Sequence, residues 1–312
     1  MKLTITFLFL VFVFSQLNAQ SSGIQFLEIG PTAAELSLSG AAVATPNGAS
    51  SIYTNPSLLV LQDRPSLSFG YTNWILDTNN LFGGINLKRG NRAFAFSFYT
   101  SGISGFEQRN NPGESNGDFS IQYLSISGAY AINIKGINFG LSTQFLTEDI
   151  YPFRATGYAF NFGISTSLSN GSIRLGTSLL NIGTMEKLDE TATILPSTFN
   201  LGIAVDVLEF THKKNPELPI LFTFMGDFVQ PIESMASNDE DFIPVTSYFN
   251  VGLELLISQI VKINIGYRTQ QNVRPMSFGI GFIADKVSFD YAIIPFNTGF
   301  GTVHSIGLQY EL

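Results

Sequence analysis

Large apolar side chains alternate with small or polar ones through most of this sequence. In the stretch 157–167, one face of an extended strand would carry Tyr158, Phe160, Phe162 and Ile164, and the other face only glycine, alanine, asparagine and serine. Successive side chains of a β-strand point to opposite faces, so a period of two residues predicts strands. The same pattern recurs along the chain after residue 65.

Fourteen such runs span 66–76, 79–88, 92–101, 119–130, 137–147, 154–167, 172–182, 197–208, 219–229, 246–257, 261–269, 275–283, 287–295 and 303–311. A membrane-spanning strand needs about 9–11 residues, with an apolar face toward lipid and its other face toward the lumen. A soluble β-sandwich also alternates, but it turns polar side chains outward, whereas here the larger side chains are almost never charged. The pattern therefore predicts an all-β membrane protein, a 14-stranded antiparallel outer-membrane β-barrel formed by residues 66–312.

The connections between the predicted strands agree with this fold in part. In a barrel whose N-terminus is periplasmic, the even-numbered connections should be short turns and the odd-numbered ones longer outer loops. The even connections 169–171 and 258–259 are short, and the odd connections 183–196 and 230–245 are long. The even connection 210–218 is longer than the rule expects, and the first odd connection is very short.

The first residues differ from the rest of the chain. Lys2 gives a positive start, residues 5–14 form an apolar run, and residues 17–19 place a small side chain before a cleavage point. This order is typical of a secretory signal peptide. The apolar run is shorter than the roughly 20 residues of a membrane anchor, so we expect residues 1–19 to be removed during export.

The composition narrows the possible functions. Only 13% of the 312 residues are charged, against about 25% in an average soluble protein. The absence of cysteine excludes disulfides, thiolate catalysis and cysteine-bound zinc. The net charge of −8 argues against nucleic acid as a partner, because phosphates attract basic patches. We expect no catalytic site, no metal site and no cofactor.

Residues 20–65 fit no strand pattern. Proline at position 31 followed by an acid in the first turn predicts a helix start, and residues 40–51 are rich in small side chains that suit close packing. The predicted lumen face of the barrel is mostly glycine, serine and asparagine, which leaves room inside. We therefore predict that residues 20–65 form a small N-terminal plug inside the barrel.

Seven charged side chains fall on the predicted lumen face. They are Arg174, Asp206, Asp227, Glu254, Lys262, Arg268 and Asp290. Charged groups inside a barrel are expected to pair with one another. We interpret them as salt bridges between the wall and the plug, and the alternative is that they face a polar ligand.

The plug also carries short motifs in a fixed order. The matching positions are Phe26, Leu27, Ile29, Gly30, Gly40, Asn55 and Pro56, and a later match is the segment 290–296 before the last strand. In this order and spacing the chain resembles the PorV/PorQ family, whose members typically read F-L-x-I, A-R-A-A-x-M-G-G-A and N-P-A. Two departures stand out, since residues 31–35 contain no arginine and Ser57 replaces the alanine.

The resemblance implies a fold and a function. PorV/PorQ proteins are Bacteroidetes-type outer-membrane barrels of the FadL-like fold, associated with type IX secretion. The implied function is a non-enzymatic accessory component of protein secretion, with outer-membrane lipid around it and the type IX translocon or secreted cargo proteins as partners. The alternative is a FadL-like passive transporter of hydrophobic small molecules, which would need an apolar pocket between plug and wall.

Overall fold

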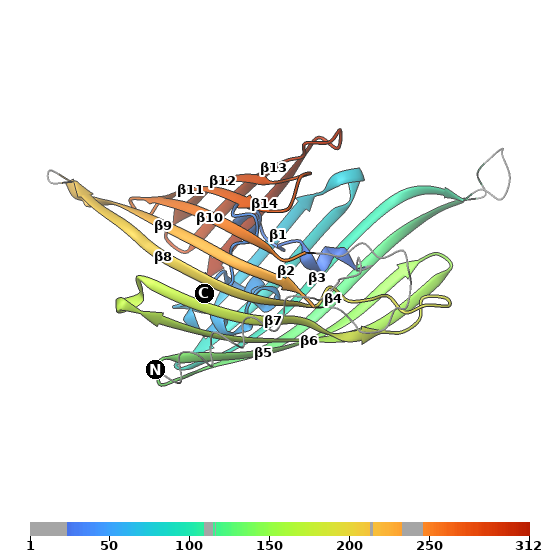
Figure 1. The fold of residues 1–312 in the computed structure, drawn as a ribbon, viewed down its shortest axis with the longest axis horizontal. Helices are drawn as coiled ribbons and strands as arrows, with labels where there is room; N and C mark the ends of the chain where they lie inside the picture. Colours follow the sequence, from blue (N-terminus) through green and yellow to red (C-terminus); the bar gives the residue numbers. More distant parts are fainter. Residues whose placement is uncertain (1–23, 109–114, 116, 213–214, 233–245) are drawn as a thin grey trace.

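The computed structural model is a closed barrel of fourteen antiparallel strands, as the alternation predicts (Figure 1). It describes residues 24–108, 115, 117–212, 215–232 and 246–312. The strands are β1 (Ser66–Asn73), β2 (Asn79–Arg89), β3 (Arg92–Gln108), β4 (Gly117–Ile134), β5 (Ile137–Ile150), β6 (Phe153–Leu168), β7 (Ile173–Met185), β8 (Thr198–His212), β9 (Asn215–Pro231), β10 (Tyr248–Ile257), β11 (Val261–Arg268), β12 (Met276–Ala284), β13 (Val287–Pro295) and β14 (Thr302–Glu311). Each strand pairs with its chain neighbour, and β1 pairs with β14 to close the barrel.

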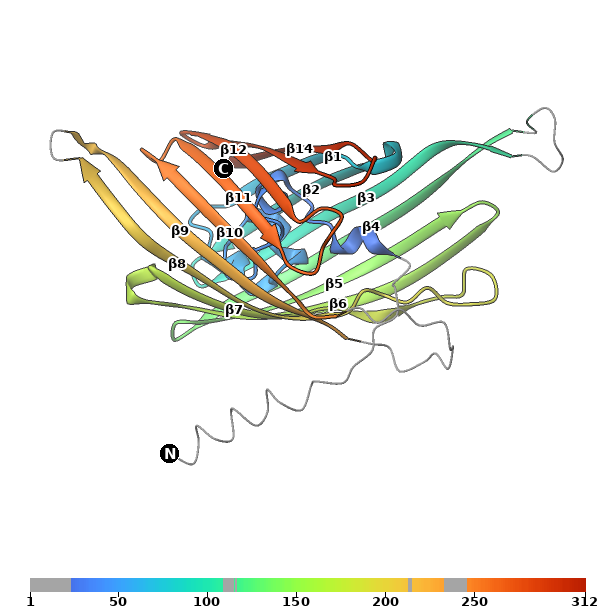
Figure 2. The same cartoon turned by 45° about the horizontal axis from the view of Figure 1, so that its top comes forward.

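Several strands are longer than the sequence pattern predicts. β3 and β4 pair as far as Gln108 and Gly117, and β8 and β9 pair as far as His212 and Asn215. The predicted long connection 210–218 is therefore wrong, because most of it belongs to these two strands. The hairpins β3–β4 and β8–β9 project from opposite ends of the barrel (Figures 1 and 2).

The two faces of the wall differ as a membrane barrel requires. On β3 the outward side chains Phe94, Phe96 and Phe98 are 50%, 58% and 41% exposed. The alternate residues Ala93 and Ala95, on the inward face, are fully buried. Large apolar groups that face water would be unfavourable, but the same groups stabilise a wall in contact with lipid. In the described residues, no helix is both long and apolar enough to cross a membrane.

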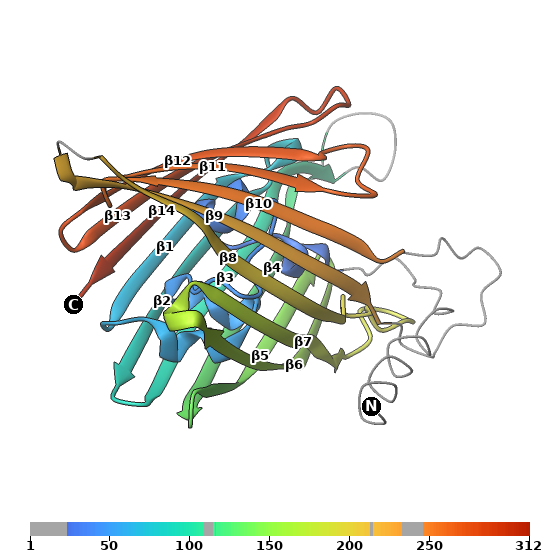
Figure 3. The same ribbon diagram turned by 60° about the vertical axis from the view of Figure 1, so that its left-hand side comes forward.

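The residues before β1 form short helices inside the barrel (Figures 2 and 3). They are the 3-10 helices η1 (Gln25–Glu28), η2 (Gly48–Tyr53) and η3 (Pro56–Leu61) and the α-helix α2 (Ala33–Ser37). We call residues 24–61 the plug. Two further 3-10 helices, η4 (Ile75–Asp77) and η5 (Ser169–Gly171), form the β1–β2 and β6–β7 connections. Residues 1–19, predicted as a signal peptide, lie outside the described residues.

We call the end of the barrel that carries the β1–β2 connection the outer rim. The longer connections, such as 186–197 and 269–275, lie at this end, while the opposite end has tight turns such as 285–286. Barrels of outer membranes place their short turns in the periplasm. This arrangement directs the outer rim toward the outside of the cell.

Candidate functional site

The lumen wall holds the plug mainly through polar side chains. Asp227 of β9 is 2% exposed, and its Oδ2 accepts hydrogen bonds from the backbone N–H groups of Ala42 and Val43, at 2.8 and 3.0 Å. Arg268 at the end of β11 donates from Nη2 to the backbone oxygen of Ser39 at 3.3 Å. These bonds tie the small-residue segment of the plug to one side of the wall.

The motif residues Asn55 and Pro56 lie next to this segment, against β5 and β6. Asn55 Oδ1 accepts the N–H of Ser57 at 3.1 Å, which caps η3, and its Nδ2 donates to the oxygen of Val43 at 2.8 Å. The wall has a glycine, Gly140 of β5, where this segment lies against it. A Cβ at this position would collide with the backbone of Pro56 and Ser57. The glycines of the lumen face therefore provide the space that the plug fills.

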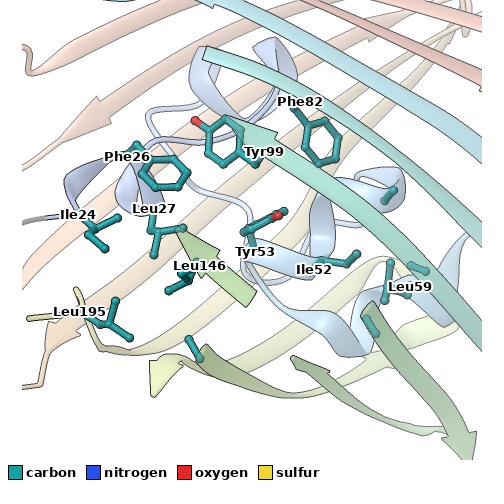
Figure 4. Packing of buried hydrophobic residues seen from close by; sticks show 14 of the residues in the cluster. Ile24, Phe26, Leu27, Ile52, Tyr53, Leu59, Phe82, Tyr99, Leu146 and Leu195 are labelled. Carbon is teal, nitrogen blue, oxygen red and sulfur yellow. The ribbon is translucent and has the colours of Figure 1, made fainter. Parts of the chain in front are cut away.

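The motif residues near the start of the plug pack into an aromatic cluster (Figure 4). The Phe26 ring lies 5.1 Å from that of Tyr99 and 5.7 Å from that of Tyr123, measured between centroids. Leu27 is buried in the same cluster, and Tyr99 Oη donates to the backbone oxygen of Ile29 at 3.2 Å. This apolar cluster is built by β2–β7 together with η1, η2 and η3.

Gly30 and Gly40 are required where the plug comes close to charged side chains. A Cβ at Gly30 would lie 3.0 Å from the Cβ of Glu35, and Gly40 has φ +85°, a conformation that favours glycine. A Cβ at Gly40 would also lie 3.1 Å from Nη2 of Arg268. Two residues of the sequence motif thus lie beside the cavities described below.

Glu35 of α2 forms a buried polar contact within the plug. Its side chain is 1% exposed, and its Oε1 accepts the hydroxyl of Ser50 at 2.6 Å, which joins α2 to η2. Within the described residues its Oε2 has no hydrogen-bond partner. Burial raises the pKa of Glu35 from 4.5 to about 7, because removal from water disfavours the charged form.

The pH dependence of stability should report this carboxyl group. Because its pKa is raised by folding from 4.5 to about 7, its contribution is fully present below pH 4.5 and is lost as the pH rises toward 7. Glu35→Gln, which stays neutral, should be more stable than the wild type at pH 8, by about 3 kcal/mol, and equal to it at pH 4. Thermal melting of both proteins across this range measures the difference. Parallel pH profiles for the two proteins would contradict the assignment.

The remaining predicted lumen charges pair within the wall. Arg174 of β7 and Asp206 of β8 form a bidentate ion pair, in which Nη1 and Nη2 of the arginine donate to Oδ2 and Oδ1 of the carboxylate at 3.1 and 3.0 Å. Lys262 of β11 pairs with Asp290 of β13. This pair crosses over β12, where a side chain at Gly281 would collide with the Asp290 carboxylate.

Glu254 of β10 completes the set of predicted lumen charges. It lies two positions along β10 from Leu256, which pairs with Lys262 of β11. Of the seven predicted residues, Asp227 and Arg268 hydrogen-bond to the plug, whereas the two ion pairs join strands of the wall to each other. The interpretation as wall-to-plug salt bridges therefore does not describe these pairs.

Two small cavities lie between plug and wall near the outer rim. The larger, of about 80 Å³, is bounded by Glu28 and Glu35 of the plug and by Asn181, Tyr248 and Arg268 of the wall. The smaller, of about 20 Å³, is bounded by Glu28, Arg268 and Arg274. One water needs about 10–15 Å³ of such space, so in this conformation the two cavities hold a few waters and do not form an apolar tunnel.

Beyond the lipid-facing band, the outer parts of β3, β4 and β5 reverse the polarity of their faces. Most outward side chains become polar, namely Thr100, Ser104, Gln122, Thr147 and Asp149, while Leu124 stays apolar. Most side chains with lumen parity become large and apolar and are half-buried, namely Ile103, Phe106, Phe119, Ile121, Tyr123 and Ile150, and the buried Glu148 lies among them. We call this second set the vestibule face.

The vestibule face leads directly to the plug. The rings of Phe106 and Phe119 stack at 5.1 Å, and Tyr123 reaches Phe26 of η1. The sequence prediction did not include all of this face, because its third strand ended at residue 101, before Ile103 and Phe106, and its fifth at 147, before Ile150. The signal was present, since alternation with the opposite polarity continues through Ile103 and Ile121.

The comparisons with known proteins identify a fold. No family model matches the sequence, and no curated protein matches it. Among solved structures, the chain is similar to the CymD monoaromatic hydrocarbon channel, at 11% identity and a TM-score of 0.58 over 91% of this chain and 98% of that one. It is also similar to a deltaS2 mutant of the TodX monoaromatic hydrocarbon channel, at 10% identity and a TM-score of 0.54 over 90% of this chain and 97% of that one.

Identities this low establish likeness of fold alone. The two channels agree with the FadL-like barrel that the sequence resemblance implies. The PorV/PorQ family in particular finds no support in these comparisons. Any function must therefore be argued from the site itself.

Proposed function

We propose that this protein is a passive channel of the outer membrane for small hydrophobic molecules, and that the plug holds it closed in the conformation described above. The observation that carries the proposal is the vestibule face. A soluble or purely structural extension would expose polar side chains on both faces, but here Phe106, Phe119 and Ile121 face inward.

The apolar vestibule face can bind small hydrophobic molecules from water. Burial of apolar surface is favourable by about 25 cal/mol per Å², so a small hydrocarbon leaves water for a half-buried aromatic surface. The polar side chains on the outward face, such as Gln122 and Asp149, keep the extension soluble beyond the lipid. The fold that the chain shares with two hydrocarbon channels supports the same proposal.

Transport requires the plug to move, since its cavities measure only about 80 and 20 Å³. The outer part of the plug is held to the wall in large part by polar hydrogen bonds, among them those from Asn264 and Ser277 to Ser37. Asp227 binds the backbone of Ala42 and Val43, and Arg268 binds that of Ser39. Each of these polar bonds can be exchanged for a hydrogen bond to water at a modest net cost.

The test compares two neighbouring residues that face opposite ways. Ile121→Asp places a charge on the vestibule face and should lower the uptake of toluene by about tenfold, since one apolar side chain contributes about 1.5–3 kcal/mol. Gln122→Asp adds the same charge on the outward face and should leave uptake unchanged. Uptake of labelled toluene is measured in a strain that lacks the gene and carries each variant. Equal uptake through both variants would refute the proposal.

A second candidate is the accessory role in protein secretion that the sequence resemblance implies. It is favoured by a groove of about 420 Å³ along the β3–β5 extension, of mixed polar and apolar lining, bounded by Thr100, Gln122, Leu124, Thr147 and Asp149. Such a groove would dock a translocon or cargo protein outside the barrel. A strain without the gene distinguishes the two functions, because normal secretion with reduced hydrophobe uptake supports the channel, and the reverse supports docking.

A further inference from the structure

Two arginines lie directly opposite each other where the β2–β3 hairpin turns, at the end of the barrel away from the outer rim (Figure 3). Arg89 is the last residue of β2 and Arg92 the first of β3, and they form the final cross-strand pair of the hairpin. Both side chains are exposed, and both share the outward face of Leu87 and Phe94. The Cβ atoms of such a pair are about 4.5–5.5 Å apart, and like charges placed there are unfavourable.

A third basic side chain lies on the neighbouring turn. Lys135 belongs to the turn between β4 and β5 and is exposed. The two turns are bonded to each other, since the N–H of Asn133 donates to the oxygen of Asn91 at 2.8 Å and Asn91 Nδ2 donates to the oxygen of Asn133 at 3.2 Å. These bonds hold the backbone of both turns in one arrangement. We call Arg89, Arg92 and Lys135 the basic patch.

The basic patch has no counter-charge within the described part of the chain. None of its three side chains forms an ion pair or a hydrogen bond with any residue that the structure describes. The strands that carry it offer none, because residues 78–106 and 119–147 contain neither aspartate nor glutamate. A cluster of like charges is stabilised by an anion that binds to it. The patch is therefore suited to an anion from outside the chain.

The apolar surroundings of the patch indicate lipid as the source of that anion. Leu87 and Phe94, the next outward residues toward the middle of the barrel, are exposed, and the Phe94 ring lies 5.0 Å from that of Tyr130. Aromatic side chains at the edge of an apolar band mark the boundary between hydrocarbon and headgroups. Ile134 and Ile137, on either side of the second turn, are also exposed. Two residues span about 7 Å of a strand, so the patch lies at the depth of the lipid phosphates.

The outer rim has the opposite charge. Its connections carry exposed acidic side chains, such as Asp77 of η4 and Glu186, Asp189 and Glu190 after β7. Anionic headgroups are repelled by such a rim and attracted by the basic patch. The short turns that carry the patch face the periplasm in the orientation given above, so the attraction acts on the periplasmic leaflet.

We propose that the basic patch binds the phosphate of an anionic phospholipid in the periplasmic leaflet of the outer membrane, with the acyl chains of that lipid on Leu87 and Phe94. A guanidinium offers a phosphate two parallel N–H groups, so one phosphate between Arg89 and Arg92 satisfies both and removes their repulsion. The bound lipid fixes the depth at which the barrel sits. This inference is independent of the proposed function, because a channel and a secretion component would both be anchored in this way.

Lipid binding to the purified full-length protein in a non-ionic detergent tests the proposal. The protein is titrated with phosphatidylglycerol and with zwitterionic phosphatidylcholine, and native mass spectrometry counts the bound lipids. Phosphatidylglycerol should bind about thirtyfold more tightly, the difference expected for two basic side chains at an anionic headgroup. Glycerol phosphate, which has the phosphate without acyl chains, should compete only weakly. Equal affinity for the two lipids, or full competition by glycerol phosphate, would overturn the proposal.

Two double variants with the same change in net charge test the residues. Arg89→Gln/Arg92→Gln should lose the thirtyfold preference for phosphatidylglycerol, and Arg89→Lys/Arg92→Lys should lose less, since lysine keeps the charge without the fork. Arg64→Gln/Lys187→Gln is the control, because Arg64 at the same end lies 3.9 Å from Glu311 and Lys187 lies at the outer rim. Equal loss of affinity in the glutamine variant and in the control would refute the site.

Melting temperatures separate lipid binding from a structural role of the two arginines. In nanodiscs of phosphatidylcholine, Arg89→Gln/Arg92→Gln should melt at or above the temperature of the wild type, because it has lost a repulsive pair. In nanodiscs of phosphatidylglycerol it should melt below the wild type, which alone gains stability from the bound lipid. A variant that melts below the wild type in both lipids would show that the arginines stabilise the barrel without lipid, and the proposal would be wrong.

Discussion

Replacing Asp227 by alanine should open the barrel. The wild-type protein is expected to show almost no ion conductance in a planar bilayer, because the plug fills its lumen. Asp227→Ala leaves the buried N–H groups of Ala42 and Val43 without an acceptor, at a cost of about 1–3 kcal/mol for each group. The population with a displaced plug should rise about a hundredfold, and single-channel recordings would show frequent openings.

A second lumen carboxylate provides the control. Asp206 lies on the neighbouring strand β8, but it pairs with Arg174 of the wall. Asp206→Ala removes the same charge without releasing the plug, so its recordings should match those of the wild type. Equal conductance of Asp227→Ala and the wild type would show that other contacts hold the plug.

A single methyl group at Gly140 should prevent the plug from packing against the wall. The Cβ of Gly140→Ala would collide with the backbone of Pro56 and Ser57, neither of which can rotate away as a side chain would. Overpacking of this kind costs about 1–3 kcal/mol or more. We expect a lower melting temperature and faster proteolysis within residues 24–61.

The matched control is Gly128→Ala on the adjacent strand β4. A Cβ at Gly128 would lie 3.7 Å from the Phe96 ring, an ordinary contact on the lipid side. Its melting temperature should equal or exceed that of the wild type. A Gly140→Ala protein as stable and protease-resistant as Gly128→Ala would contradict the close packing of η3 against β5.

Strand number and the two faces of the wall were predictable because both depend on local alternation. Phe94, Phe96 and Phe98 reveal their lipid-facing side without any knowledge of their partners. The ends of β3 and β4 were not predicted. The alternation continues there with its polarity reversed, whereas the prediction expected apolar side chains only on the lipid face. Pairing beyond the membrane follows from backbone hydrogen bonds, which do not depend on which face is apolar.

The candidate site depends on contacts that no local pattern contains. Asp227 could be placed in the lumen by parity, but its two N–H partners lie at Ala42 and Val43, far away in the chain. Arg274 escaped notice because it belongs to a connection, where alternation assigns no face. Its proximity to Arg268 arises only when the connection folds back over the plug. The motif residues Gly30 and Gly40 could be singled out by resemblance, whereas the side chains they make room for could not.

The close approach of the plug to the wall also bears on the order in which the barrel assembles. The first strand lies against the plug at Gly70, where a Cβ would collide with the backbone oxygen of Pro31. The last strand lies near it at Gly307, where a Cβ would lie 3.4 Å from the nitrogen of Ala33. These two strands form the seam that closes the cylinder. A plug packed this closely against both strands fits best if it is in place when the seam forms, so we expect it to fold before the barrel closes. The N-terminal segment then provides a surface inside the barrel against which β1 and β14 pair.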